Sequence, residues 1–391
     1  MITQNINGPI NYCCMEGNIN GDEKKITIFM DKHYGLDEQT RCDSFDSMDI
    51  SQYMYKQIIN ANEQIDFFLE ISTSEIKNKQ TNKRDTYIND LFEMFKSEFV
   101  TEKINDKDVV RYSKSNPNVR LHFLDIRDGM DLNDIRQIIQ SQILINFKKL
   151  LNTKYNREKY SIQILNYFEQ IHLKLDKLTN DKNEIIKLDG DYSKFTETDK
   201  QRYYINKIFN KYDNKELKHN LINFLNINYE NIITNLDIVT RDIEKVLKNI
   251  EYVSIDKINE MYKHMGFVEE AVIDLYSLFV DCFLLRRMLD KNYISNSIIY
   301  TGTQHSIHYI FFLHKYYNFE ITKIYHLEIN NNEFLKKIKD AHFVFEIYKY
   351  IKINKKYPQC VLFNLMYGGN EYMEYLKIKI KERRYMDKRF L

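Results

Sequence analysis

Four polar side chains stand where apolar, strand-like segments of the chain end. They are His33, Glu70, Arg127 and His305. If these segments are neighbouring parallel strands, their carboxyl ends meet at one edge of a sheet, and the four side chains converge there. Two imidazoles and a carboxylate suit a first-row divalent metal with an open coordination position. They suit equally a metal-free site in which one imidazole is the base and the carboxylate orients it.

Both versions of this site remain open from the residue types alone. In the metal version, His33, Glu70 and His305 hold Mn, Fe, Co or Zn, and the ion lowers the pKa of a bound water. In the metal-free version, one of the two histidines deprotonates water, and Glu70 holds that histidine in its orientation. Arg127 assists the reaction in either version.

Three further polar residues flank these positions and are predicted to contact a substrate. They are Asp31, Asp125 and His308. Arg127 with Asp125 suits a bidentate grip on a carboxylate or phosphate, and a structural ion pair between the two is equally compatible. His308 is expected on the helix that follows His305, where it is either a second ligand or a residue that packs beside the site.

The elements expected to position these residues alternate as in an α/β protein. Strands are predicted from short apolar runs, at residues 26–30, 65–71, 119–126, 296–301 and 320–327. Helical spacing of apolar residues predicts helices over 49–60 and 308–317, and the run 360–365 fits a further strand or a short helix. This order predicts a mostly parallel central sheet flanked by helices.

The domain organisation follows from a change of pattern along the chain. Residues 131–290 show repeated helical spacing and predict a large all-helical insertion. The α/β core is then split into residues 25–130 and residues 291–391, and the second part ends in a basic helix at 377–389. Residues 1–24 are polar, contain glycine turns, and are predicted to be a loose lead-in.

The composition of the 391 residues excludes several classes of protein. The chain has 57 Lys and Arg against 56 Asp and Glu, so nucleic acid is not an expected partner. A hydrophobic content of 43% supports a buried core and argues against extensive disorder. The chain contains no GxxxxGK[ST], no HExxH and no GxSxG, and no GxGxxG follows a predicted strand. P-loop, Rossmann, zincin and serine-hydrolase chemistry are therefore not supported.

Cysteine usage and hydropathy indicate the compartment. Five scattered cysteines without a CxxC pair predict a reducing environment, and Cys42 is interpreted as an ordinary thiol. The most apolar stretch, 271–289, carries four charges, which predicts a buried helix and no membrane span. No secretory signal is visible, so we predict a cytoplasmic protein.

The segments that carry the candidate residues resemble a known superfamily. It joins TraB/TIKI proteins, ChaN-like haem-binding lipoproteins and erythromycin esterase-like enzymes, with a GxxH after an early strand, a glutamate ending the next, and a late GxxH. The corresponding segments are Phe68-Leu69-Glu70 and Gly302-Thr-Gln-His305, with Met30-Asp-Lys-His33 as a partial match. Met30 replaces the usual glycine, which departs from the close backbone approach expected there. The resemblance covers roughly 26–127 and 296–328.

This resemblance implies a hydrolase or a metal- or haem-binding fold. TIKI-type members are metal-dependent peptidases, and esterase-like members use a histidine without metal. The predicted function is therefore hydrolysis of a peptide or ester bond in a peptide or small-molecule substrate. The alternative is a non-catalytic interaction or structural protein on a retired hydrolase fold, with a protein partner bound by the helical insertion. Abundant Lys, Asn, Ile and Tyr without Trp indicate a divergent member encoded by a large DNA virus, located in the host cytoplasm or the virion.

Overall fold

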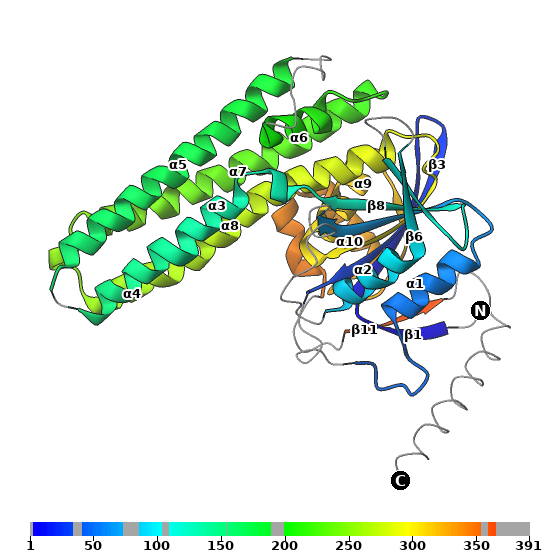
Figure 1. Cartoon of the computed structure of the whole chain (residues 1–391), viewed down its shortest axis with the longest axis horizontal. Helices are drawn as coiled ribbons and strands as arrows, with labels where there is room; N and C mark the ends of the chain where they lie inside the picture. Colours follow the sequence, from blue (N-terminus) through cyan, green and yellow to red (C-terminus); the bar gives the residue numbers. More distant parts are fainter. Residues whose placement is uncertain are drawn as a thin grey trace, which may run out of the picture.

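The protein consists of a large sheet, a small sheet and a set of long helices that project from the large sheet as an arm (Figure 1). The computed structural model describes residues 3–33, 41–72, 86–103, 109–153, 155–188, 199–352 and 359–364. The basic helix predicted at 377–389 lies outside the described residues.

The large sheet has eight strands. They are β2 (Asn11–Ile19), β3 (Asp22–Asp31), β5 (Ile65–Ser72), β6 (Phe99–Lys103), β7 (Val109–Ser113), β8 (Val119–Asp125), β9 (Asn296–Gly302) and β10 (Glu320–Ile324). Their order is β10-β2-β3-β9-β5-β8-β7-β6. The central strands β3, β9, β5 and β8 are parallel, and antiparallel strands extend the sheet on both sides. The predicted α/β class, with parallel strands, flanking helices and a large helical region, is confirmed.

Helices cover the sheet and build the arm. Those near the sheet are α1 (Ile50–Ile59), α2 (Tyr87–Glu98), η1 (Arg127–Gly129), α9 (Thr303–Tyr317), α10 (Asn331–Asp340) and η4 (Val344–Tyr350). Those of the arm are α3 (Leu132–Gln137), η2 (Ile138–Ile143), α4 (Leu144–Asn152), α5 (Arg157–Lys187), α6 (Lys200–Phe209), α7 (Lys215–Leu247), η3 (Ile250–Tyr252) and α8 (Ile255–Leu289).

The central strands are buried on both faces, which is why they are continuous apolar runs. In β3, Ile28 and Met30 belong to the hydrophobic cluster formed with α8 and α9, whereas Phe29 belongs to the cluster formed with α1 and α2. Successive side chains of a strand point to opposite faces, so one short run supplies both clusters. The sheet is therefore held between two layers of helices.

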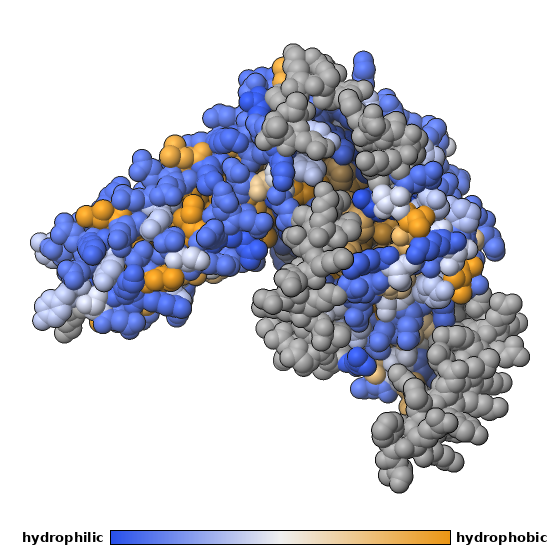
Figure 2. Space-filling model, in the orientation of Figure 1, coloured by the Kyte–Doolittle hydropathy of each residue, from blue (hydrophilic) through white to orange (hydrophobic). Residues whose placement is uncertain are grey.

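The arm is continuous with the core through one helix. The first half of α8 packs along α7 in the arm, and its second half is almost completely buried beside α9. Figure 2 shows a mostly hydrophilic surface on the arm, with separate hydrophobic spots. No helix in the part of the chain that the structure describes is long and apolar enough to cross a membrane.

The amino-terminal residues correct the prediction of a loose lead-in at 1–24. They form β2, which pairs with β3 along its whole length, and β1 (Thr3–Asn7) in the small sheet. Asn20 and Gly21 both have positive φ, 53° and 94°, at the turn between β2 and β3. An Asn-Gly pair in this conformation joins two antiparallel strands, and its polar flanks concealed the hairpin in the sequence.

The small sheet joins distant parts of the chain. Its order is β11-β1-β4, with β4 at Met48–Asp49 and β11 at Cys360–Asn364, so the last apolar run is a strand. Cys42, predicted to be an ordinary thiol, forms a disulfide with Cys360. The pairing arises because β11 lies beside β1, where the Asn7 side chain accepts a hydrogen bond from the backbone N–H of Cys42 (2.8 Å).

Candidate active site

The carboxyl ends of the four parallel strands meet at one edge of the large sheet. Asp31, the last residue of β3, is in register with Gly302, the last residue of β9. On the other side of β9, Tyr300 is in register with Leu69 of β5. Strand β8 ends alongside at Asp125. Residues that follow these positions are therefore brought together, as the strand order requires.

Glu70 lies at the centre of this group. Its Oε1 accepts a hydrogen bond from Arg127 Nη2 (2.9 Å) and lies 3.1 Å from His305 Nε2. Its Oε2 accepts one from the backbone N–H of Gly302 (2.6 Å) and lies 3.3 Å from His33 Nε2. The carboxylate is nearly buried, and a buried carboxylate is tolerated only when it is paired with cations and hydrogen-bond donors of this kind. The structure thus brings the other three predicted residues, His33, Arg127 and His305, onto the carboxylate of Glu70.

Gly302 allows this close approach. A Cβ atom at Gly302 would lie 3.1 Å from His33 Nε2 and 3.2 Å from Glu70 Oε2. A side chain at this position would be crowded, because the backbone itself approaches the site. Met30, which departs from the glycine of the early motif, is buried in the core and lies away from this contact. The close backbone approach occurs at Gly302 of the late motif.

His33 is the most exposed member of the group, with 34% of its side chain accessible. Its φ of 53° is unusual for a residue with a side chain and costs of order 1–3 kcal/mol. Its Nδ1 lies 3.1 Å from Asp31 Oδ2. Strained backbone of this kind is common at functional sites, where surrounding contacts hold a side chain in one direction.

His305 lies in the first turn of α9 and is almost completely buried. Its Nδ1 is 2.6 Å from Asp281 Oδ1, and Asp281 is on α8. The other oxygen of Asp281 is hydrogen-bonded to His308 Nδ1, and His308 Nε2 lies 2.7 Å from the hydroxyl of Tyr348. Neither Asp281 nor Tyr348 was predicted. A carboxylate within the apolar run of α8 was the one available signal for Asp281.

The charges of these groups depend on one another. Burial lowers the pKa of His33, but hydrogen bonds to Asp31 and Glu70 and their charges outweigh it and raise the pKa to about 10. For His305, burial is likewise outweighed by Glu70 and Asp281, and its pKa is also raised to about 10. Burial raises the pKa of Glu70, but the two imidazoles hold it well below its usual range. At neutral pH, both histidines are protonated and Glu70 is ionised.

Two residues predicted to bind substrate have other positions. Asp31 is fully buried and accepts hydrogen bonds from the backbone of Lys32 (2.7 Å) and from Gln359 Nε2 (2.9 Å), in addition to holding His33. His308 is fully buried between Asp281 and Tyr348 and does not face the exposed side of the site. Because both side chains are buried, Asp31 holds His33 and His308 holds Asp281, and neither faces the exposed part of the site.

Asp125 and Arg127 form the ion pair that was one of the two predictions for them. Arg127 Nε and Nη2 donate to the two oxygens of Asp125 (2.9 Å each), and Nη2 also reaches Glu70. Burial lowers the pKa of Arg127, but the charges of Asp125 and Glu70 outweigh it and raise the pKa above its ordinary value. The side chain of Arg127 is one-fifth exposed. Arg127 and His33 both contact the carboxylate of Glu70.

The predicted metal ligands meet as ion pairs. Each Glu70 oxygen already has two partners, and the Nε2 atoms of His33 and His305 both point to that carboxylate. In the described ranges of the chain, no three His, Cys, Asp or Glu side chains are placed to hold a metal ion. The contacts of His33, Glu70 and His305 in the structure are hydrogen bonds and ion pairs among the side chains themselves.

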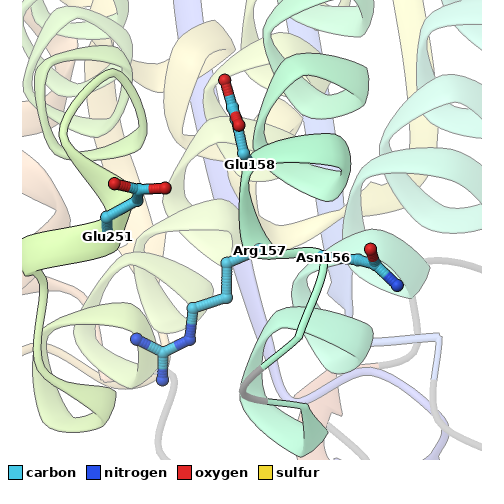
Figure 3. A pocket seen from close by; sticks show the side chains of 4 residues that line it. All are labelled: Asn156, Arg157, Glu158 and Glu251. Atoms are coloured by element: carbon cyan, nitrogen blue, oxygen red, sulfur yellow. The ribbon is translucent and has the colours of Figure 1, made fainter.

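A cavity of about 560 Å³ opens at the far end of the arm, lined by Asn156, Arg157, Glu158 and Glu251. Arg157 Nη1 donates to the carbonyl oxygen of Val253 (3.1 Å), which joins the turns that precede α5 and α8. The four lining side chains point in different directions and do not converge (Figure 3). The sheet edge therefore remains the candidate active site.

Comparison with known proteins places the whole chain in one family. The family described as "Family of unknown function (DUF5847)" matches residues 4–366. The chain belongs to this family. The match spans both the sheet and the arm, so both are parts of the DUF5847 fold. No solved structure matches the chain.

Three relatives come from Acanthamoeba polyphaga mimivirus. "Uncharacterized protein R161" is 30% identical, over 91% of this chain and 95% of its own length. "Uncharacterized protein R706" is 28% identical over 91% and 94% of the two chains, and "Uncharacterized protein R160" is 27% identical over 86% and 91%. The DUF5847 relatives thus support the predicted origin in a large DNA virus.

Proposed function

We propose that this DUF5847 protein is a hydrolase of peptide or ester bonds whose proton-transfer residue is His33. The observation that supports this is the convergence of His33, His305 and Arg127 on the single buried carboxylate of Glu70. Three cationic side chains and four carboxylates at a sheet edge are costly to bury, and such groups cluster at catalytic sites. The substrate would be a peptide or a small molecule.

His33 is the working residue because it alone combines exposure with an orienting carboxylate. Asp31 holds Nδ1 and leaves Nε2 directed to the site. This is the arrangement by which a carboxylate fixes an imidazole so that its second nitrogen exchanges a proton with water or substrate. His305 is too deeply buried for this task and instead balances the charge of Glu70.

The contact between His33 Nε2 and Glu70 Oε2 is where water enters the reaction. At 3.3 Å it is a long hydrogen bond for two ionised groups, and it lies beside the exposed part of the ring. In its neutral form His33 no longer donates a hydrogen bond to Glu70, and a water at the exposed edge of the ring donates one proton to Nε2 as it attacks the carbonyl carbon of the substrate. His33 then returns the proton to the leaving group.

Arg127 stabilises the negative charge that develops on the substrate oxygen. Its ion pairs with the described residues use Nε and Nη2, and we propose that Nη1 donates to that oxygen. A fixed donor that meets charge only as the charge develops lowers the barrier without tightening substrate binding. Glu70 stays ionised throughout and keeps the guanidinium and both imidazoles in place.

The paired motifs support the same proposal. The segments around Glu70 and His305 resemble the superfamily of TraB/TIKI, ChaN-like and erythromycin esterase-like proteins, and we propose that DUF5847 is a divergent branch of it. Within that superfamily, the esterase-like members use a histidine without metal. This use agrees best with the contacts of Glu70, whose two oxygens pair with His33, His305, Arg127 and the backbone of Gly302. The location in host cytoplasm or virion stays a prediction.

The test is a comparison of two histidine variants on a panel of p-nitrophenyl esters and fluorogenic peptides. His33→Asn keeps the positive φ that Asn tolerates, and should lower kcat/KM by about 100-fold or more. His172→Asn is the control, because His172 is equally exposed and also pairs with a carboxylate, 3.4 Å from Glu244. Equal activity of the two variants would refute the role of His33. Activity that requires added metal after chelation would refute the metal-free mechanism.

The second candidate function is a non-catalytic interaction protein. It is favoured by the saturation of the site, in which both ring nitrogens of His33 and of His305 already contact carboxylates. In that case His33→Asn only removes a stabilising contact and lowers the melting temperature. In an enzyme, the strained His33 is held for function, and the variant loses activity at unchanged or higher stability.

A further inference from the structure

We infer that Asp281 of α8 is the positioning residue of His305, and that His308 and Tyr348 hold Asp281 in place. The inference rests on the proposed function, since His305 acts by keeping Glu70 ionised beside His33. It adds a residue from the arm helix to the site and gives a role to a buried carboxylate that the reaction itself does not use.

The first support is the geometry of His305. Its two ring nitrogens face two different carboxylates, Glu70 at 3.1 Å and Asp281 at 2.6 Å. A ring held at both nitrogens by acceptors can neither rotate nor lose its hydrogen bond on one side without leaving a buried charge unpaired. Asp281 therefore fixes the direction in which His305 presents its Nε2 to Glu70.

The second support is the cost of placing Asp281 where it is. Asp281 is completely buried and lies between Val280 and Cys282 in the most apolar part of α8. It therefore contacts no solvent and takes no part in a surface ion pair. Packing of α8 against α9 alone would be served at least as well by an apolar side chain. A carboxylate at this position is explained by the imidazoles that it faces.

The third support is the double use of Asp281. Its Oδ2 is hydrogen-bonded to His308 Nδ1, and Tyr348 from η4 lies 2.7 Å from the far nitrogen of the same ring. His308 follows His305 by three residues, so both imidazoles lie on one face of α9. Two elements, α9 directly and η4 through His308, thus hold the carboxylate of α8, which is more than a simple helix contact needs.

The experiment compares ring-nitrogen chemical shifts of ¹⁵N-histidine-labelled protein with steady-state kinetics. In Asp281→Asn, we expect both ring-nitrogen shifts of His305 to move and kcat to fall about 10- to 100-fold, with KM changed less than about threefold. Asp66→Asn is the matched control, because Asp66 is also fully buried and lies 2.6 Å from a histidine, His122. It should leave His305 and kcat unchanged.

The outcomes separate this inference from the proposed function. Unchanged His305 shifts in folded Asp281→Asn protein overturn it. Shifted His305 signals in a protein that hydrolyses no substrate uphold the positioning role and refute the hydrolase. If Asp281→Asn does not fold, Tyr348→Phe replaces it, since it removes only a hydroxyl from the set. It should move the signals of His308 and of His305, and an unaltered His305 then overturns the inference.

Discussion

At the scale of residues, the candidate site is a row of groups with alternating charge. In order of contact they are Asp31, His33, Glu70, His305 and Asp281, and His33 is the exposed member. Each histidine has a carboxylate on both sides, and Glu70 has an imidazolium on both sides. Because the pKa values of His33, Glu70, His305 and Asp281 depend on the charges beside them, removal of one charge changes the protonation equilibria of its neighbours.

The Glu70→Gln variant tests this dependence. Loss of the central charge should lower the pKa of both His33 and His305 from about 10 toward the ordinary value of about 6.5. The proposed base is neutral His33, so the pH at which activity reaches half its maximum should fall in the same direction. An NMR titration of the two imidazoles and a pH–rate profile measure these effects. A histidine pKa near 10 in the variant would contradict the assignment.

The same pKa shifts set the sign of a stability effect. The raised pKa of His305 means that the folded protein binds its proton more tightly than the unfolded chain does. The resulting stabilisation is complete below about pH 6.5 and is lost as the pH rises through about 10. The difference in unfolding free energy between wild type and Glu70→Gln should therefore shrink over this range, as urea titrations would show.

Residue types and strand ends were enough to predict which side chains converge. His33, Glu70, Arg127 and His305 were expected to meet if the strands before them are parallel neighbours, and β3, β9, β5 and β8 are parallel neighbours in the sheet. Asp281 could not be predicted because its position depends on how α8 crosses the core, which no local pattern records. The same holds for the hydrogen bond from Gln359 to Asp31.

At the scale of elements, the junction of β9 and α9 is held by hydrogen bonds to two other strands of the sheet. The chain turns there from strand to helix, with the backbone N–H of Gly302 bonded to Glu70 (2.6 Å) and the hydroxyl of Thr303 bonded to the backbone oxygen of Asp31 (2.9 Å). Helix α9 begins before the predicted 308–317 because these bonds already fix its first turn. As a result, His305 is on a helix and not in a loop.

Two glycine variants test this junction against a helix interior. Gly302→Ala places a methyl group 3.1 Å from His33 Nε2, and should cost about 1–3 kcal/mol of unfolding free energy and displace the His33 ring. Gly266→Ala meets nothing within 4 Å in α8, and should stabilise the protein by about 0.5–1 kcal/mol. Urea denaturation of both variants gives the comparison. Equal effects of the two substitutions would show that the junction is not crowded.

Elements with a strong pattern were predictable, and elements set by turns were not. The runs 26–30, 65–71 and 296–301 are strands, with bounds that differ by a few residues. The hairpin of β2 and β3 was missed because β2 is partly polar and gains part of its burial from β10, which lies just over 300 residues later. Burial by a distant partner overrides the local composition of a strand.

At the scale of the whole molecule, the two ends of the described chain are joined. Strand β11 pairs with β1, and the disulfide of Cys42 and Cys360 links positions 318 residues apart. The arm and the large sheet lie in the sequence between these ends. The pairing was not predictable from five scattered cysteines, since only the fold brings these two together.

Opening this disulfide should affect both stability and the site. The Cys42→Ser/Cys360→Ser double variant should lose about 2–5 kcal/mol of unfolding free energy, because a cross-link over a long segment restricts the unfolded chain. Reductant should lower the stability of the wild type to the same value and leave the double variant unchanged. Thiol counting provides the control, with more reactive thiols in the denatured wild type after reduction than before it.

The effect reaches the site because Gln359, next to Cys360, donates its hydrogen bond to Asp31 (2.9 Å), and Asp31 holds His33. Release of β11 should therefore shift the ring-nitrogen signals of His33 more than those of His305, which is held from the opposite side by α8. Equal stability of the oxidised and the fully reduced wild type would show that the pairing of β1 with β11 holds these strands together without the disulfide. Unmoved His33 signals at lower stability would show that the disulfide supports the fold and not the site.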